Sequence, residues 1–201
     1  AASRSQAKAG DLNGAIALLQ AAVQAAETKA TKRAELTQAW DQLGKFPWMG
    51  NRKVEARALL SKSVAAKEAA FGLNAPEVAD TLDEMSNAFT LPDEHLAMLP
   101  VLSRSRQIRE SAFGASSFRV APSVVLLATY YRALGDAKAE ELYRQAIALC
   151  EPTHFEPQGP GLSALVGLAQ FLQEQGRGLE AEIVRDRFNA EVDRSAKLGL
   201  Q

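Results

Sequence analysis

The sequence predicts an all-α fold in which antiparallel helix pairs stack into a solenoid. One observation is an internal echo: the stretch KEAAFGLNAPEVADTL, Lys67–Leu82, returns 42 residues later as RESAFGASSFRVAPSV, Arg109–Val124. Another is a register of small residues at intervals of 41, 42, 41 and 42, at Ala15, Ala56, Met98, Ala139 and Ala181. A period of about 40 residues combined with helical spacing of apolar residues is typical of helical repeat proteins.

On this register the chain begins inside a repeat. Ala1–Ala9 is the stub of a first helix, and Leu12–Glu27 is expected to be a second helix. Its apolar face would have half its usual cover, at Leu18, Leu19 and Val23. We therefore expect that a longer protein was trimmed here, or that another chain or domain covers this end.

The second helix of each later unit follows a turn and carries apolar residues at helical spacing. The preceding turns are Asn51, Pro92-Asp93 and Gly135-Asp136. The apolar positions include Leu59, Leu60 and Val64, then Leu142, Tyr143, Ala146 and Ile147. In the last unit Arg185 replaces the expected apolar residue, as in a terminal repeat that faces water.

The first helices follow a different template, in which an apolar series is followed by a small residue. The small residues are Gly44, Ser86, Ala128 and Ala169. They allow helices to approach closely, because a bulky side chain there would hold the backbones apart. Three proline features modify the pattern: Pro47 ends its helix near Lys45, Pro100 falls within the early turns of a helix, and Pro152–Pro160 is a loop.

Composition excludes several functional classes. The chain has 201 residues, 47% of them hydrophobic, and a net charge of -1, which provides no basic surface for nucleic acid or an anionic membrane. No apolar run approaches the ~20 residues of a membrane-spanning helix. A single cysteine, Cys150, and two histidines, His95 and His154, predict neither a disulfide nor a metal site, and no cofactor. The compartment is left open, with the cytoplasm favoured.

The segment Trp40-Asp-Gln-Leu43-Gly44, continued by Ala56, resembles the opening of the tetratricopeptide repeat (TPR) signature. The long hinge FGLNAPEVA, Phe71–Ala79, is similar to the extended repeats of kinesin-light-chain type. The resemblance implies a right-handed superhelix formed by one domain over residues 1–201. A partial repeat at 1–30 would precede repeats at about 31–72, 73–114, 115–156 and 157–198.

The resemblance also implies a binding groove lined by the first helices, used for a protein or peptide partner. Carried over from the family, the groove positions are Gln38, Asp41, Gln42, Lys45, Asp80, Asp83, Glu84, Asn87, Val125, Leu126, Thr129, Arg132, Val166, Gln170 and Gln173. Related clamps for terminal carboxylates place lysine and asparagine in such grooves. Here only Lys45, Asn87 and Arg132 are available and scattered, which disfavours an acidic C-terminus as the ligand.

The charge pattern of the groove favours a basic, amphipathic partner. Asp80, Asp83 and Glu84 place three carboxylates on one helix, and Val125 and Leu126 follow on the next first helix. The alternative is that the carboxylates are ordinary surface charges and that the two apolar residues are buried against a neighbouring helix.

Catalysis is not predicted, because the sequence contains no nucleophile with its base, no metal-ligand cluster and no glycine-rich phosphate cradle. Cys150 is expected to be a small buried hydrophobe. Trp40 is expected in the core, and Trp48 either packs in a connection or anchors a partner. The alternative to a peptide groove is a regulatory domain of a larger signalling protein that self-associates through its N-terminal end.

Overall fold

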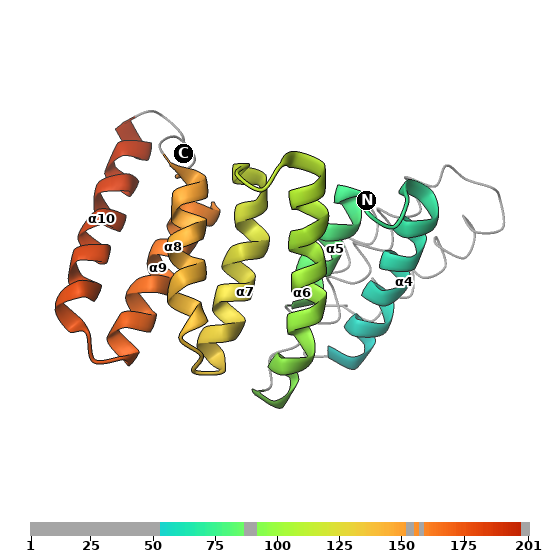
Figure 1. Cartoon of the computed structure of the whole chain (residues 1–201), viewed down its shortest axis with the longest axis horizontal. Helices are drawn as coiled ribbons and strands as arrows, with labels where there is room; N and C mark the ends of the chain where they lie inside the picture. Colours follow the sequence, from blue (N-terminus) through green and yellow to red (C-terminus); the bar gives the residue numbers. More distant parts are fainter. Residues whose placement is uncertain (1–52, 87–91, 152–154, 157–158, 198–201) are drawn as a thin grey trace, which may run out of the picture. The chain divides into compact units, whose positions relative to one another are not determined.

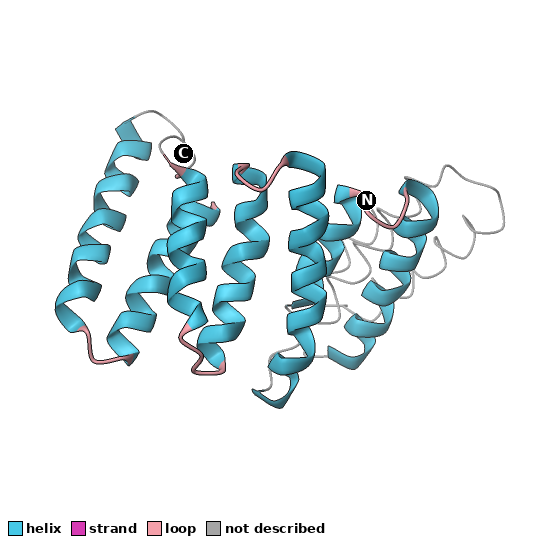
Figure 2. Cartoon of the chain, in the orientation of Figure 1, coloured by secondary structure: helices cyan, strands magenta, loops and turns pink. Residues whose placement is uncertain are grey.

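A computed structural model describes residues 53–86, 92–151, 155–156 and 159–197 of the chain. Within these residues the regular structure is helical and contains no strand (Figure 2). The chain divides into two compact units, Ala1–Thr90 and Leu91–Gln201. The prediction of an all-α fold is confirmed.

Unit 1 contains a packed helix pair, α4 (Lys53–Phe71) and α5 (Pro76–Met85). Pro76 occupies the first position of α5, where the missing N–H leaves no intrahelical bond unmade. The buried face of α5 consists of Val78, Ala79, Thr81 and Leu82. The buried Lys67 ammonium of α4 donates a hydrogen bond to Thr81 Oγ1 at 2.7 Å, which links the two helices through polar groups as well as apolar ones.

Unit 2 is a series of antiparallel helices (Figure 1). In chain order these are α6 (Pro92–Phe113), the short 3-10 helix η2 (Phe118–Val120), α7 (Ala121–Ala133), α8 (Lys138–Cys150), α9 (Pro160–Glu174) and α10 (Gly178–Lys197). Each helix from α6 to α10 packs on the next, and α7 also contacts α9. Contact between alternate helices is what stacks one helix pair on another.

The hinges that precede the first helices α5 and α7 are built with the same hydrogen bonds. The Gly72 N–H donates to the Glu68 carbonyl at 2.9 Å, and 42 residues later the Gly114 N–H donates to the Glu110 carbonyl at 2.9 Å. Both glycines adopt positive φ, 97° and 86°, a region that residues with a Cβ enter only with strain. A second bond follows at the same offset in each hinge, from Val78 to Ala75 and from Val120 to Ser117.

The core of unit 2 is formed by the facing sides of α7, α8 and α9, and includes Ala181 of α10. Its buried members include Val120, Val124, Ala128, Tyr143, Ile147, Leu162, Leu165, Leu168 and Leu172. The small residues expected between helices are buried where the structure describes them, at Ser86, Ala128 and Ala169. Close helix approach at these positions follows from their size.

Cys150 and Pro100 lie where the sequence predicts them. Cys150 is fully buried, and burial raises the pKa of its thiol to about 11, with a smaller contribution from Glu156. Pro100 lies inside α6, which continues through it. Trp40, Trp48 and the segment Leu12–Glu27 lie outside the described residues.

Candidate functional site

A hollow of about 410 Å³ lies between the first helices α7 and α9 of unit 2. Its walls are mainly apolar. The lining residues are Val125, Thr129 and Arg132 of α7, Leu162, Ser163, Val166, Gly167 and Gln170 of α9, Tyr143 of α8 and Phe188 of α10.

The close contact of α9 with Tyr143 depends on Gly167. A Cβ placed on Gly167 would lie 2.3 Å from Tyr143 Cε1 and 2.7 Å from the phenol oxygen. These separations are far shorter than van der Waals contact, so only glycine fits this helical position. The missing side chain lets Tyr143, which is 1% exposed, reach from α8 to the hollow between α7 and α9.

The hydrogen bonds of Thr129 and Tyr143 determine which hydroxyl oxygen can still accept a hydrogen bond from a ligand. Thr129 Oγ1 donates its single proton to the Val125 carbonyl at 2.9 Å. In the 3.1 Å contact between Thr129 Oγ1 and the Tyr143 hydroxyl, Tyr143 must therefore be the donor. The Tyr143 oxygen keeps its acceptor capacity, which makes it a polar point in a mostly apolar hollow.

The rim of the hollow is polar. Arg132 donates to Glu174 Oε1 at 2.6 Å, which forms an ion pair between α7 and α9. Its Nε is buried and has no hydrogen-bond partner among the described groups. Gln170 is exposed beside it. The exposed amide of Gln170 can therefore offer N–H donors to the backbone of a bound segment.

The hollow brings together five of the predicted groove residues, Val125, Thr129, Arg132, Val166 and Gln170. Val125 is only 8% exposed and forms part of a wall, whereas Val166 is 40% exposed. Two others on these helices do not line it. Leu126 is half-buried, and Gln173 is exposed and accepts a hydrogen bond from Arg185 at 3.2 Å.

The predicted acidic residues belong to unit 1. Asp80 is exposed on α5, and Asp83 and Glu84 are half-buried. Each of the three already has an interaction partner. Their pairing with Val125 and Leu126 remains a prediction, as does the role of the groove residues outside the described part of the chain, Gln38, Asp41, Gln42, Lys45 and Asn87.

Sequence reasoning missed half of the residues that line the hollow, namely Tyr143, Leu162, Ser163, Gly167 and Phe188. Gly167 carried a usable signal, because an isolated glycine inside an apolar helical pattern often marks a close approach. Tyr143 carried none, since its spacing is that of an ordinary core residue.

The described residues bear on three features: metal-binding clusters, reactive thiols and membrane-spanning helices. No group of three histidine, cysteine, aspartate or glutamate side chains lies close enough there to hold a metal ion. The thiol of Cys150 is buried, with a raised pKa that disfavours the nucleophilic thiolate. In the same part of the chain, no helix is both long enough and apolar enough to cross a membrane.

Stacked antiparallel helix pairs with a hollow between successive first helices define the class of helical repeat solenoids. No protein-family model matches the chain, and no curated protein matches it. Solved structures of TPR-like repeat proteins do match. BtubC from P. vanneervenii aligns with a TM-score of 0.80 at 20% identity, over 99% of this chain and 79% of that one.

Two further solved structures extend the comparison. A putative kinesin light chain of Podosopora anserina, with nearly identical TPR-like repeats, aligns with a TM-score of 0.73 at 20% identity, covering 96% of this chain and 92% of that one. MamA aligns with a TM-score of 0.64 at 19% identity, covering 97% and 96%. The chain therefore has the fold of TPR-like repeat proteins, with kinesin-light-chain-like repeats among its structural neighbours.

Proposed function

We propose that this protein is a protein-interaction scaffold that binds a segment of a partner protein in the hollow between α7 and α9. The observation that carries the proposal is the 410 Å³ hollow, with largely apolar walls and few polar groups. Binding sites of this kind gain affinity from apolar burial and orientation from a few placed polar groups.

The hollow suits an apolar side chain of the partner. Val166, 40% exposed, and Val125 are the aliphatic walls from the two first helices. The free acceptor on Tyr143 favours a hydrogen-bond donor at the inner end of the incoming group, and Arg132 and Gln170 can bind carbonyl oxygens of its backbone. The mechanism is equilibrium binding to a preformed surface, without a catalytic step.

Selection of random displayed peptides on the whole protein tests this function. We expect peptides that bind the wild-type protein to lose at least about tenfold in affinity for Val166→Asp, because a carboxylate would be buried among apolar groups. Val166 is half exposed, so the variant should keep the wild-type melting temperature. Ser103→Asp, at an exposed position on α6, is the matched control and should bind normally.

Retention of wild-type affinity by every selected peptide on Val166→Asp, with an unchanged melting temperature, would contradict the proposal. Isothermal titration calorimetry of purified variants provides both the affinity and the stoichiometry. A stoichiometry of one peptide for each chain is expected for a single hollow.

The basic, amphipathic character of the partner rests on the carboxylates of α5. Replacing Asp83 and Glu84 by lysine should abolish binding of a basic ligand, because attraction becomes repulsion at both positions. The affinity of a lysine-containing peptide, measured by fluorescence anisotropy at low and high salt, decides the matter. Unchanged affinity in the doubly substituted protein would exclude a role for these carboxylates.

A further inference from the structure

A second hollow lies on another surface of unit 2, in the furrow between α8 and α10. Its volume is about 310 Å³, and its lining is mostly aliphatic. The lining side chains are Ile147 and Ala148 of α8, Leu165 and Leu168 of α9, and Ile183 and Val184 of α10, with Arg144, Glu151 and Arg187 at the rim. It shares no residue with the hollow between α7 and α9.

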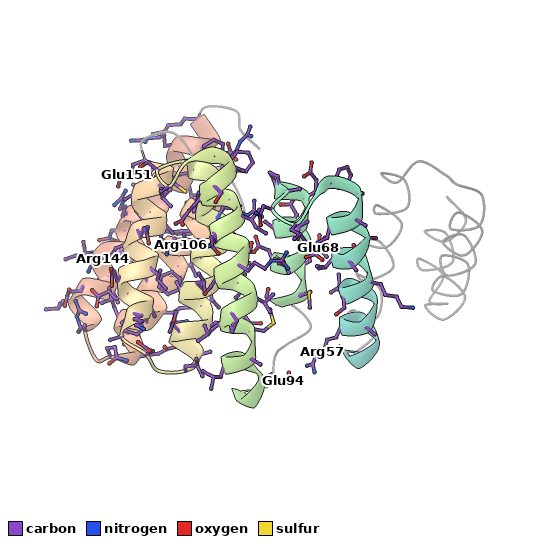
Figure 3. The ribbon with its side chains drawn as sticks, turned by 45° about the vertical axis from the view of Figure 1, so that its right-hand side comes forward. Arg57, Glu68, Glu94, Arg106, Arg144 and Glu151 are labelled. Atoms are coloured by element: carbon purple, nitrogen blue, oxygen red, sulfur yellow. The ribbon has the colours of Figure 1, made fainter. Side chains whose placement is uncertain are left out.

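The charged groups along the furrow are paired with one another. Arg177, which precedes α10, donates to Glu140 of α8 at 2.6 Å, and Arg144 donates to the same carboxylate at 2.8 Å. At the C-terminal end of α8, Glu151 pairs with Arg187 of α10. Arg144 lies on α8 and Glu151 directly follows its last residue, and both border the furrow (Figure 3). Arg177 also pairs with Glu180, so three arginines and three carboxylates are paired on this side of the furrow, and their net charge is zero.

Two large aliphatic side chains beside the hollow are exposed to solvent. Ile183 is 69% exposed while it lines the hollow, and Leu179, one helical turn earlier on α10, is 81% exposed. Residues four apart share a helix face, so the two side chains and the hollow form one continuous apolar strip. Exposed apolar strips rimmed by polar groups mark interaction surfaces.

The far flank of this strip is acidic. Glu182 and Asp186 are exposed on α10, and neither forms an ion pair with any described residue. Their spacing of three and seven residues from Leu179 places them on the same outward face. A second copy of the chain docked antiparallel would bring these carboxylates together, which disfavours self-association through this face.

We propose that the strip formed by Leu179, Ile183 and the furrow hollow is a docking site for an amphipathic helix of a partner protein that carries lysine or arginine on one flank. One aliphatic side chain of the partner enters the hollow against Ile147 and Val184. The basic flank lies over Glu182 and Asp186, where unpaired carboxylates face water. The neutral rim on the α8 side places the positive charge on one flank only.

The probe is a fluorescein-labelled synthetic helix of about 18 residues, built from leucine, alanine and lysine with leucines spaced three and four apart. A matched peptide replaces every lysine by glutamate. Fluorescence anisotropy with the whole protein should show binding of the lysine peptide alone. Hydrogen exchange of the complex should show protection of α10 and of the α8 residues along the furrow.

Substitutions separate the two contributions to binding. Ile183→Ser and Leu179→Ser should each weaken binding of the lysine peptide by about tenfold, with little effect on the melting temperature because both side chains are exposed. Glu182→Gln combined with Asp186→Asn should weaken it several-fold and flatten its salt dependence. Glu77→Gln, at an exposed position of α5 that lines neither hollow, is the control and should leave it unchanged.

Four results would overturn the proposal: equal binding of the glutamate peptide, unaltered binding to Ile183→Ser, exchange protection confined to α7 and α9, or a concentration-dependent dimer that Leu179→Ser dissolves. The third of these would support the hollow between α7 and α9 instead. Loss of peptide binding at Val166→Asp with retention at Ile183→Ser separates failure of this inference from failure of the proposed function.

Discussion

Gly167 and Tyr143 show how one residue shapes the candidate binding site. Without a side chain on Gly167, the phenol ring of Tyr143 passes close to the α9 backbone and lines the hollow. The Tyr143 hydroxyl is held by Thr129, whose own proton is committed to the Val125 carbonyl. Ring position and hydroxyl direction are thus fixed before any ligand arrives, and a preorganised site of this kind loses less entropy on binding.

Gly167→Ala tests this contact. Alanine has the higher helix propensity by about 1 kcal/mol, but its Cβ would overlap a ring that is 1% exposed, and overpacking typically costs about 1–3 kcal/mol. We expect a net loss of about 1–2 kcal/mol in the free energy of unfolding, measured by urea denaturation. Gly178→Ala is the matched control, since a Cβ there meets nothing within 4 Å. Equal stability of the two variants would contradict the packing account.

Single residues were predicted from the sequence where one dominant property decides the outcome. Cys150 is buried as expected, because a small, weakly polar side chain at the end of an apolar helix face packs with that face in the core. The hydroxyl chain from Tyr143 to Val125 could not be predicted. It depends on the separation of α7 and α8 to within an ångström. The spacing of apolar residues along the sequence does not determine that separation.

At the scale of elements, helix pairs are held by ion pairs as well as by apolar packing. Glu140 of α8 receives hydrogen bonds from Arg177 and Arg144, and Arg177 also donates to Glu180 of α10 at 2.6 Å. Mainly through the bond from Arg177, and despite partial burial, the pKa of Glu140 is lowered from its ordinary value. The pKa of Arg177 is raised by hydrogen bonds to Glu180 first and then to Glu140.

The lowered pKa of Glu140 gives stability a defined dependence on pH. A carboxyl whose pKa is lower in the folded protein stabilises it above the unfolded-state pKa, near 4.5, and loses that contribution as pH falls through the folded-state value. Glu140→Gln should therefore melt at a lower temperature than wild type at pH 7, and the difference should shrink as the pH is lowered below about 4.5. Calorimetric melting temperatures from pH 7 to pH 3 measure this. A difference that persists undiminished at pH 3 would exclude the ionic contribution.

Helix boundaries followed closely from the sequence where turn residues mark them. The Phe71-Gly72 and Phe113-Gly114 pairs end α4 and α6 as expected. The start of α7 departs from the pattern, because the short helix η2 precedes it and Ser117 Oγ accepts from the Arg119 N–H at 3.3 Å. Unit 1 has Ala75 at the position of Ser117, without a side-chain acceptor, and there α5 begins directly.

At the scale of the whole molecule, the fold class was predictable and the complete binding surface was not. A period of 41 to 42 residues specifies a stack of helix pairs wherever the chain repeats it. The groove of such a stack depends on which side chains are absent as much as on which are present, and Gly167 is an example. The predicted acidic and apolar parts of the groove belong to different units, Ala1–Thr90 and Leu91–Gln201, and their cooperation stays a prediction.

The core of unit 2 leads to a prediction about the chain as a whole. All members of the large buried cluster, from Val120 to Ala181, belong to unit 2. We expect the fragment 91–201 to fold without unit 1, because nearest-neighbour packing stabilises repeat arrays. Circular dichroism should show a helical fragment with a cooperative thermal transition. An unfolded fragment would show instead that residues 1–201 form one cooperative domain, as the sequence pattern suggested.

The duplicated hinge has a consequence for how such a chain can change in length. Because Gly72 and Gly114 make equivalent hydrogen bonds at equivalent offsets, the joint at the end of one repeat is compatible with the start of another. Recombination within the two similar stretches would add or delete a whole module and leave an intact joint. Unequal crossing-over can thus generate longer or shorter relatives in which the existing hinge still joins consecutive repeats.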